Sequence, residues 1–206
     1  MHELWISVDH VEGACSAPTP MRTGTGFLVR DGRLHFPGGG PVCLFALQSI
    51  LPLVPAKERT IAEERTVDWL WRIDAVQCPD PKGRTVWTIE QRTPGTTTVA
   101  PPSIPGPRPG DLTLTVDRVD GACTAGTAPG HRALIRGSAV YLAQPFCLYA
   151  LQAALPLLPA MARPLAPDDW MATENAVICP DPAGNVILRI DKVADEGSVA
   201  EGGRDE

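Results

Sequence analysis

Apolar and polar residues alternate along several short stretches of the chain. LWISVDHV at 4–11 alternates with a period of two, which predicts a strand with one buried face. GFLVRDGRLHF at 26–36 predicts a hairpin that turns at Asp31-Gly32. IDAVQC at 73–78 and TVWTIEQ at 85–91 predict two further strands.

One stretch between these strands has a different pattern. CLFALQSIL at 43–51 is apolar at nearly every position, so it predicts a short buried helix rather than a surface helix. Pro52 and Pro55 are expected to end it, because proline lacks the N–H that a helix interior needs. From there to Trp69 we predict a variable loop.

The whole pattern occurs twice. Three blocks recur: ELWISVDHVEGACSA at 3–17 and DLTLTVDRVDGACTA at 111–125, PVCLFALQSILPLVPA at 41–56 and PFCLYALQAALPLLPA at 145–160, and CPDP at 78–81 and 179–182. The second copy also repeats the hairpin, the short strand and the last strand, as ALIRGSAVYL at 133–142, ENAVIC at 174–179 and VILRIDK at 186–192. We therefore predict an α+β fold of two tandem repeats. Each has a small, mainly antiparallel sheet and one short buried helix in the order β-β-β-α-β-β.

The repeats divide the chain. We predict a first module at 1–92, a Pro-rich linker at 93–110, a second module at 111–193 and a disordered acidic tail at 194–206. One module alone has a thin core. The two are therefore expected to pack together as an intramolecular pseudo-dimer with pseudo-twofold symmetry.

Charge and hydropathy exclude some partners. The net charge is −6, and the last twelve residues contribute −4 of it, with five acids and one arginine. No basic stripe suits nucleic acid, and no apolar run approaches the roughly 18 residues of a membrane span. The N-terminus lacks a secretion signal, so we expect a cytoplasmic protein that binds neither nucleic acid nor membrane.

Six cysteines occupy equivalent positions in the two copies, three in each. They are Cys15, Cys43 and Cys78, and Cys123, Cys147 and Cys179. In a reducing compartment such residues are more often thiols or metal ligands than disulfides. Neighbouring positions differ between the copies, for example Ser16 and Thr124, whereas all three cysteines are retained.

The expected positions of the cysteines favour convergence. Cys15 and Cys123 lie in Gly-flanked turns, Cys43 and Cys147 open the buried helix, and Cys78 and Cys179 end a strand before proline. The free N–H groups of a helix start favour a thiolate, and a residue before proline is held extended. We expect each trio to meet at one end of its module.

Three thiolates around one point suit a soft metal. Zinc would need a fourth ligand or water, and an iron–sulfur cluster would keep one open iron. The spacing does not decide this, because no C-x-x-C occurs and the gaps are 27 and 34 residues in the first copy and 23 and 31 in the second. Buried apolar cysteines and reactive or redox thiols stay as alternatives.

Other residues are candidates for the same sites. His131, only eight residues after Cys123, is the best candidate for a fourth ligand. His10 and His35 do not recur, and we expect them on the surface or in strands. Asp80 and Asp181 lie between two prolines, where each carboxylate either forms a turn or acts beside the thiol.

Two further residue types recur in both copies. Trp69 and Trp170 each follow an aspartate, and we expect core anchors rather than walls of a pocket. Gln48 and Gln152 lie on the buried helix, where each amide must find a partner, for which we expect loop backbone. Motifs typical of serine hydrolases, phosphate loops, zinc proteases and dinucleotide-binding folds do not occur.

In two tandem copies, the chain resembles a small and largely uncharacterised prokaryotic family of proteins of about ninety residues. The family pattern is C-x-x-G-H-x-x-G-D, then a cysteine opening a helix that carries ALYP, then CPDP before the last strand. The second copy keeps Cys123, Gly126 and Gly130, followed by CLYALQAALP and CPDP. Thr127 replaces the family histidine and His131 the aspartate, while the first copy, with CSAPTPMRTG, has an insertion and no histidine. The resemblance implies a shared fold but no activity.

The leading hypothesis is a metal-binding or iron–sulfur protein with a redox or biosynthetic role, in which the six cysteines are ligands and an open position acts as a Lewis acid. The main alternative is a metal-free enzyme of specialised metabolism that binds a small molecule between the modules. Its catalytic candidates are Cys179, Asp181, Cys78 and Asp80. A third is an accessory protein that serves a partner enzyme without catalysis. The second copy, closer to the family pattern, is predicted to be the working one.

Overall fold

The structure, a computed structural model, describes residues 3–97 and 103–194. In the first half the strands are β1 (Glu3–Val11), β2 (Gly26–Arg30), β3 (Arg33–His35), β4 (Val42–Cys43), β5 (Ala75–Gln77) and β6 (Thr85–Arg92). The helices are α1 (Leu44–Ile50) and α2 (Val54–Ala62), with short 3-10 turns η1 (Pro37–Gly39) and η2 (Trp69–Arg72).

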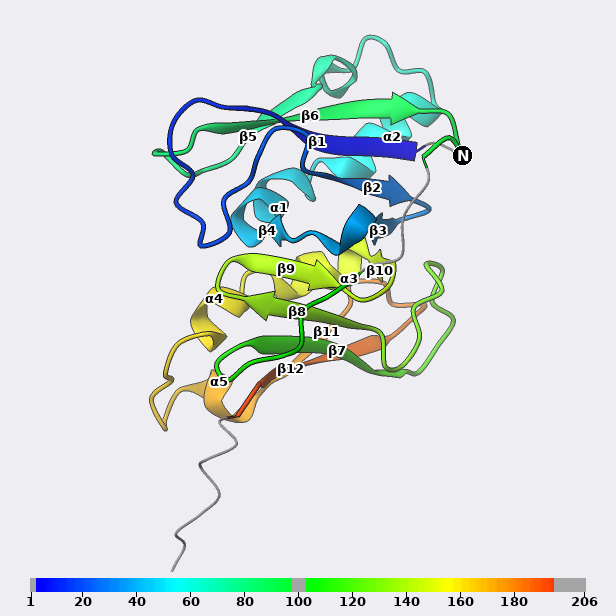
Figure 1. Cartoon of the computed structure of the whole chain (residues 1–206). Coiled ribbons are helices and arrows are strands. Elements are labelled where there is room, and N and C mark those ends of the chain that lie inside the picture. Colours follow the sequence, from blue (N-terminus) through cyan, green and yellow to red (C-terminus); the bar gives the residue numbers. More distant parts are fainter. Residues whose placement is uncertain (1–2, 98–102, 195–206) are drawn as a thin grey trace, which may run out of the picture.

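The second half repeats this order. Its strands are β7 (Leu112–Val119), β8 (Arg132–Arg136), β9 (Ala139–Leu142), β10 (Phe146–Cys147), β11 (Ala176–Ile178) and β12 (Val186–Lys192). Its helices are α3 (Leu148–Ala154), α4 (Leu158–Met161) and α5 (Trp170–Thr173). The predicted α+β fold is confirmed: each half builds most of one six-stranded antiparallel sheet, and the helices are few and short (Figure 1).

The two sheets exchange their edge strands. The strand orders are β10-β3-β2-β1-β6-β5 and β11-β12-β7-β8-β9-β4, so each half supplies one edge strand to the other half's sheet. Phe146 lies opposite Leu34, and Val42 lies opposite Val140. The exchange covers an edge that each sheet would otherwise expose. A two-residue strand is too short to leave an alternating pattern, which is why the sequence-based order lacks it.

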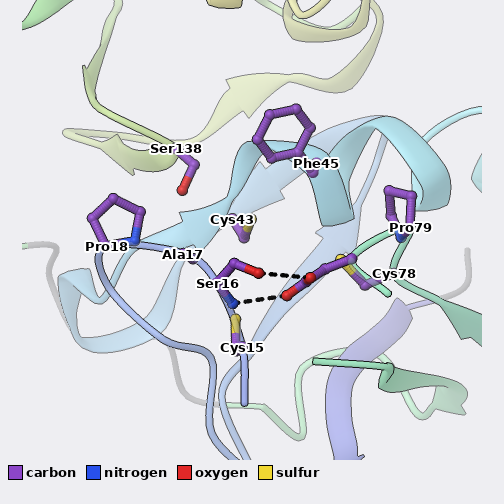
Figure 2. A pocket seen from close by; sticks show the side chains of 10 residues that line it. Cys15, Ser16, Ala17, Pro18, Cys43, Phe45, Cys78, Pro79 and Ser138 are labelled. Carbon is purple, nitrogen blue, oxygen red and sulfur yellow. Dashed lines mark hydrogen bonds between the residues drawn. The ribbon is translucent and has the colours of Figure 1, made fainter. Parts of the chain in front are cut away.

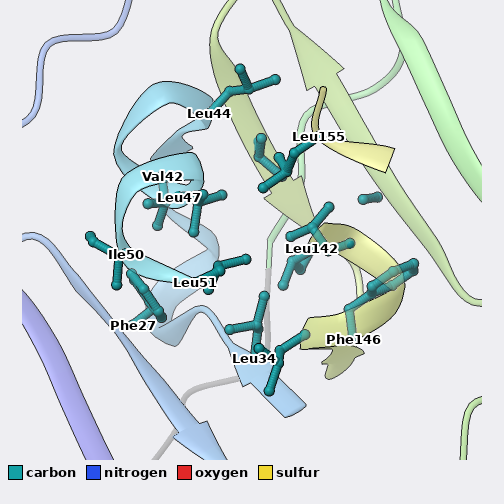
Figure 3. Close-up of a cluster of buried hydrophobic side chains, with 14 of the residues drawn as sticks. Phe27, Leu34, Val42, Leu44, Leu47, Ile50, Leu51, Leu142, Phe146 and Leu155 are labelled. Atoms are coloured by element: carbon teal, nitrogen blue, oxygen red, sulfur yellow. The ribbon is translucent and has the colours of Figure 1, made fainter. Parts of the chain in front are cut away.

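A single apolar core runs through both halves. Leu34 and Leu51 from the first half lie near Phe146 and Leu155 from the second, and all four side chains are buried (Figure 3). The Gln48 side chain donates a hydrogen bond of 3.1 Å to the Leu155 carbonyl, so its amide is paired with backbone across the halves. The expectation that the repeats pack together is confirmed.

Helix α2 was not predicted. Pro52 follows α1 as expected, but Pro55 lies in the first turn of α2 and begins that helix instead of ending one. A proline suits this position because the first N–H groups of a helix have no intrahelical partner. The counterpart α4 ends after four residues, shortly before Pro164. The first half therefore carries a longer second helix than the second half.

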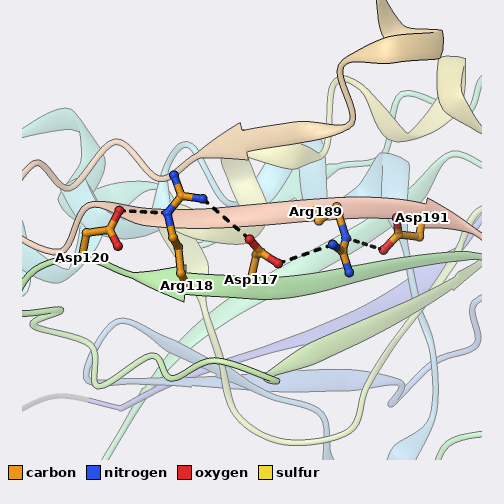
Figure 4. Close-up of polar contacts among 5 residues, drawn as sticks. All are labelled: Asp117, Arg118, Asp120, Arg189 and Asp191. Atoms are coloured by element: carbon orange, nitrogen blue, oxygen red, sulfur yellow. Dashed lines mark hydrogen bonds and ion pairs between the residues drawn. The ribbon is translucent and has the colours of Figure 1, made fainter.

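The outer face of the second sheet is charged. Asp117, Arg118 and Asp120 on and after β7 alternate with Arg189 and Asp191 on β12 (Figure 4). All five side chains are exposed to solvent, so these ion pairs add little stability. Their exposure shows that this face of the sheet faces solvent. Within the described residues, no helix is long and apolar enough to cross a bilayer. Apart from Ala194, the predicted tail lies outside the described residues.

Candidate functional site

The cysteines of the first half meet in one pocket. A cavity of about 400 Å³ is lined by Cys15, Cys43 and Cys78 together with Ser16, Ala17, Pro18, Phe45, Pro79, Asp80 and Ser138 (Figure 2). Ser138 belongs to the second half, so the pocket lies where the halves meet. Its carbonyl accepts the N–H of Leu44 at 2.7 Å, which fixes the start of α1 beside it. The predicted convergence of this trio is confirmed.

The cysteines of the second half form an equivalent pocket. A cavity of about 550 Å³ is lined by Cys123, Cys147 and Cys179 together with Thr124, Ala125, Tyr149, Pro180, Asp181, Asp31, Gly32 and Arg59. The last three come from the first half. The Gly32 carbonyl accepts the N–H of Leu148 at 2.9 Å, the counterpart of the bond in the first pocket. Each cysteine pocket is therefore built by both halves.

The repeated CPDP sequence forms a turn, and in the first half this turn is hydrogen-bonded to the loop that carries Cys15. Asp80 accepts hydrogen bonds from the Ser16 N–H at 2.8 Å, the Ser16 hydroxyl at 2.7 Å and the Lys82 N–H at 3.0 Å. Bonds led by those from Ser16 lower the pKa of Asp80 to about 2. Asp181 likewise accepts the Ala183 N–H at 3.0 Å. Both aspartates form turns, as one of the two sequence hypotheses predicted, and both also line a pocket.

Glycines let the two loops touch. A Cβ on Gly121 would lie 2.1 Å from the Ala183 carbonyl oxygen, and one on Gly184 would lie 3.2 Å from the Cα of Cys123. The Ala122 N–H donates to the Ala183 carbonyl at 2.8 Å. This close contact explains why both sequences recur. The Gly-Ala-Cys loop packs against the turn that follows Cys-Pro-Asp-Pro, and each of the two segments brings one cysteine to the pocket.

Most of the thiols for which a shift is resolved favour the neutral form. Burial raises the pKa of Cys78 and of Cys179. Burial also raises the pKa of Cys147, although the N–H groups of Ala150 and Tyr149 at the start of α3 act in the opposite direction. The N–H groups of the helix start favour the Cys147 thiolate, as expected, but desolvation outweighs them, so the net pKa of Cys147 is raised.

Cys123 is the exception. Burial raises its pKa, but the Thr127 hydroxyl and the N–H groups of Thr127 and Ala125 outweigh this effect, so the net pKa is lowered. The Thr127 hydroxyl also hydrogen-bonds Cys147. Thr127 therefore lies between two thiols, at the position where the resembled family has histidine. In the sequence, Thr127 stands out only as a departure from the family pattern.

The predicted metal ligands are the six cysteines, with His131 as the best candidate for a fourth ligand. Within the described part of the chain, no three His, Cys, Asp or Glu residues are grouped closely enough to hold a metal ion. His131 does not line the second pocket, His10 pairs with Asp9 at 2.7 Å, and His35 lies half-buried on β3. The six cysteines are free thiols here, and their role as metal ligands stays a prediction.

The repeated tryptophans are not core anchors. Trp69 is 64% exposed and Trp170 is 59% exposed, so the prediction is wrong. Each begins a short helix that the preceding aspartate caps: the Asp68 carboxylate accepts the Leu70 N–H at 2.9 Å, and Asp169 does the same for Met171. Leu70 and Met171, next along the chain, turn toward the core instead.

Comparison of the chain with protein-family models, with curated proteins and with solved structures found no match. The resemblance to the small prokaryotic family therefore stays a prediction. The evidence for the site is the arrangement of its residues in the two cavities.

Proposed function

We propose that the protein is an enzyme that binds a small molecule in a thiol-lined pocket between its halves, and that the second pocket is the working one. The supporting observation is that three cysteines and one aspartate from each copy line one cavity, which the other half closes. Cavities of this size, mostly apolar with a few converging polar groups, are typical of small-molecule sites.

Cys123 is the proposed nucleophile. Its lowered pKa increases the thiolate fraction at neutral pH, and the thiolate is the reactive form. In a substitution at an electrophilic carbon, the sulfur of Cys123 forms the new bond with its own electron pair. The leaving atom takes the electrons of the broken bond, and Cys179, a neutral thiol in the same pocket, supplies its proton. Thr127 orients the thiolate through its hydroxyl.

The test is the alkylation rate of each thiol, measured with iodoacetamide on the whole protein at several pH values and assigned by peptide mass spectrometry. Cys123 is expected to react fastest of the six. Thr127→Val keeps the shape of the side chain but removes its hydroxyl. The alkylation rate of Cys123 should therefore fall roughly tenfold at pH 7, the loss expected for one hydrogen bond to a charged group. Cys15 is the matched control and should not change. If Cys123 reacts no faster than the buried thiols, its proposed role as nucleophile is wrong.

A second candidate is a soft-metal or iron–sulfur site, favoured by the presence of three thiols around each of two cavities. Such a site would use Cys123, Cys147 and Cys179 as ligands and leave one coordination position of the metal open to the cavity. The three side chains would first have to turn toward a common point. A metal held this way would supply Lewis-acid or redox chemistry. Elemental analysis and an absorption spectrum of protein purified without oxygen test it. Stoichiometric zinc, or iron with sulfide, would support this candidate, and metal-free protein with six titratable thiols would contradict it.

A further inference from the structure

The two cysteine pockets differ in the wall that faces the thiols. The hairpin pairs Arg30 with Arg33 in the first half and Arg136 with Ala139 in the second, so Asp31 corresponds to Gly137. The alignment of the helix blocks makes Tyr149 the counterpart of Phe45. The second pocket thus has a carboxylate and a phenol where the first has a hydrogen atom and a phenyl ring.

The longer helix of the first half adds a positive charge to the same wall. Arg59 lies on α2 and lines the second pocket. Its counterpart Arg163 lies beyond the end of α4, hydrogen-bonds the Pro159 carbonyl, and does not line the first pocket. The early end of α4 therefore removes from the first pocket a cation that α2 brings to the second.

The charges in the second pocket are opposite in sign and are not used in ion pairs. Arg59 supplies the positive charge, and Asp31 and Asp181 supply negative charges. None of these three residues forms an ion pair with another of the residues that the structure describes. A guanidinium binds a carboxylate well, and carboxylates bind an ammonium group.

We propose that the second pocket binds a small zwitterion of the amino-acid class, with Arg59 holding its carboxylate and Asp31 and Asp181 holding its ammonium group. The proposal rests on the proposed function for the location of the site, and it names the substrate class. A cavity of about 550 Å³ leaves room for a side chain against Ala125, Pro180 and the Tyr149 ring. The first pocket lacks the counterparts of Asp31 and Arg59, so it is expected not to bind such a molecule.

The experiment uses the full chain and the standard L-amino acids. Thermal-shift screening selects the amino acid that stabilises most, and calorimetry then compares it with its decarboxylated amine and its deaminated acid. Each analogue is expected to bind at least tenfold more weakly, because one charge-assisted contact is lost. Arg59→Gln and Asp31→Asn should each weaken the binding of the amino acid by a similar factor. Arg163→Gln, the matched control, should leave its affinity unchanged.

The outcomes separate this inference from the proposed function. If no amino acid binds, or if binding survives both Arg59→Gln and Asp31→Asn, the zwitterion proposal is overturned, whatever the reactivity of Cys123. If an amino acid binds through Arg59 and Asp31 while Cys123 alkylates no faster than the other thiols, the ligand class is supported and only the nucleophile is wrong.

Discussion

The continuous core predicts that a defect in one half destabilises the other. Leu188 lies on β12 in the second half and is fully buried. Leu188→Ala removes buried methyl groups and leaves a cavity, which costs about 3 kcal/mol in typical cores. With a urea dependence of roughly 2–3 kcal/mol per M, the unfolding midpoint should fall by about 1 M.

The loss of stability is measured by the tryptophan fluorescence of the opposite half, the first. Trp87 is fully buried in the first half, with its ring centroid 6.2 Å from that of Phe27. Trp170 is the only tryptophan of the second half, so a Trp170→Phe background makes fluorescence report on the first half alone. The fluorescence midpoint should fall together with the far-UV circular dichroism midpoint, because the halves unfold as one unit.

Two variants control the experiment. Ile178→Ala, also in the second half but 55% exposed, should shift the midpoint little. Leu4→Ala, fully buried on β1, should shift it about as much as Leu188→Ala. If Leu188→Ala lowers the circular dichroism transition but leaves the fluorescence midpoint in place, the halves are energetically independent and the reasoning is refuted.

Three other changes test parts of the account. Asp80→Asn should lower the melting temperature at pH 7; because its folded pKa is depressed to about 2, the difference from wild type should disappear as the pH falls from about 4 toward 2, and a pH-independent difference would contradict this. Gly121→Ala places a methyl group against the Ala183 carbonyl, so alkylation should show an altered rate at Cys123 and an unchanged rate at Cys15. Burial and the charge of Asp31 raise the pKa of Glu58, so Glu58→Gln should raise the melting temperature at pH 7, and this gain should vanish below about pH 4; a variant less stable than wild type at pH 7 would count against it.

Local patterns are enough to predict the strands of three residues or more and the buried helix, but not the two-residue strands β4 and β10. The last strand of the second half matches its prediction at Val186–Lys192, because one of its faces is buried and the other exposed. The sequence pattern misses helix α2 because Pro52 and Pro55 both predict the end of a helix, whereas Pro52 precedes α2 and Pro55 lies in its first turn. A tryptophan repeated beside an aspartate does not reveal which residue of the short capped helix packs on the core, and in the structure it is Leu70 in one half and Met171 in the other.

The site was predictable in part. The repeated cysteines and CPDP turns identified the thiols that line each pocket, because both signals lie within one copy. Asp31 and Arg59 could not be assigned to the second pocket in this way, since they come from the other half. Only the exchange of β4 and β10 brings these segments together, and strands of two residues leave no periodic signal.

The strand exchange can be tested directly by a disulfide. Cys43 of the first half lies opposite Ala139 of the second in the pairing of β4 with β9. Side chains at such positions have Cβ atoms about 4.5–5.5 Å apart, close to the span of a disulfide. Ala139→Cys should therefore form a bond to Cys43 under mild oxidation, visible as one cross-linked peptide pair. Ala133→Cys, which faces Leu142, is the control and should form none. If the thiol introduced at position 139 stays free or pairs elsewhere, the halves do not exchange strands and the pockets are not built by both of them.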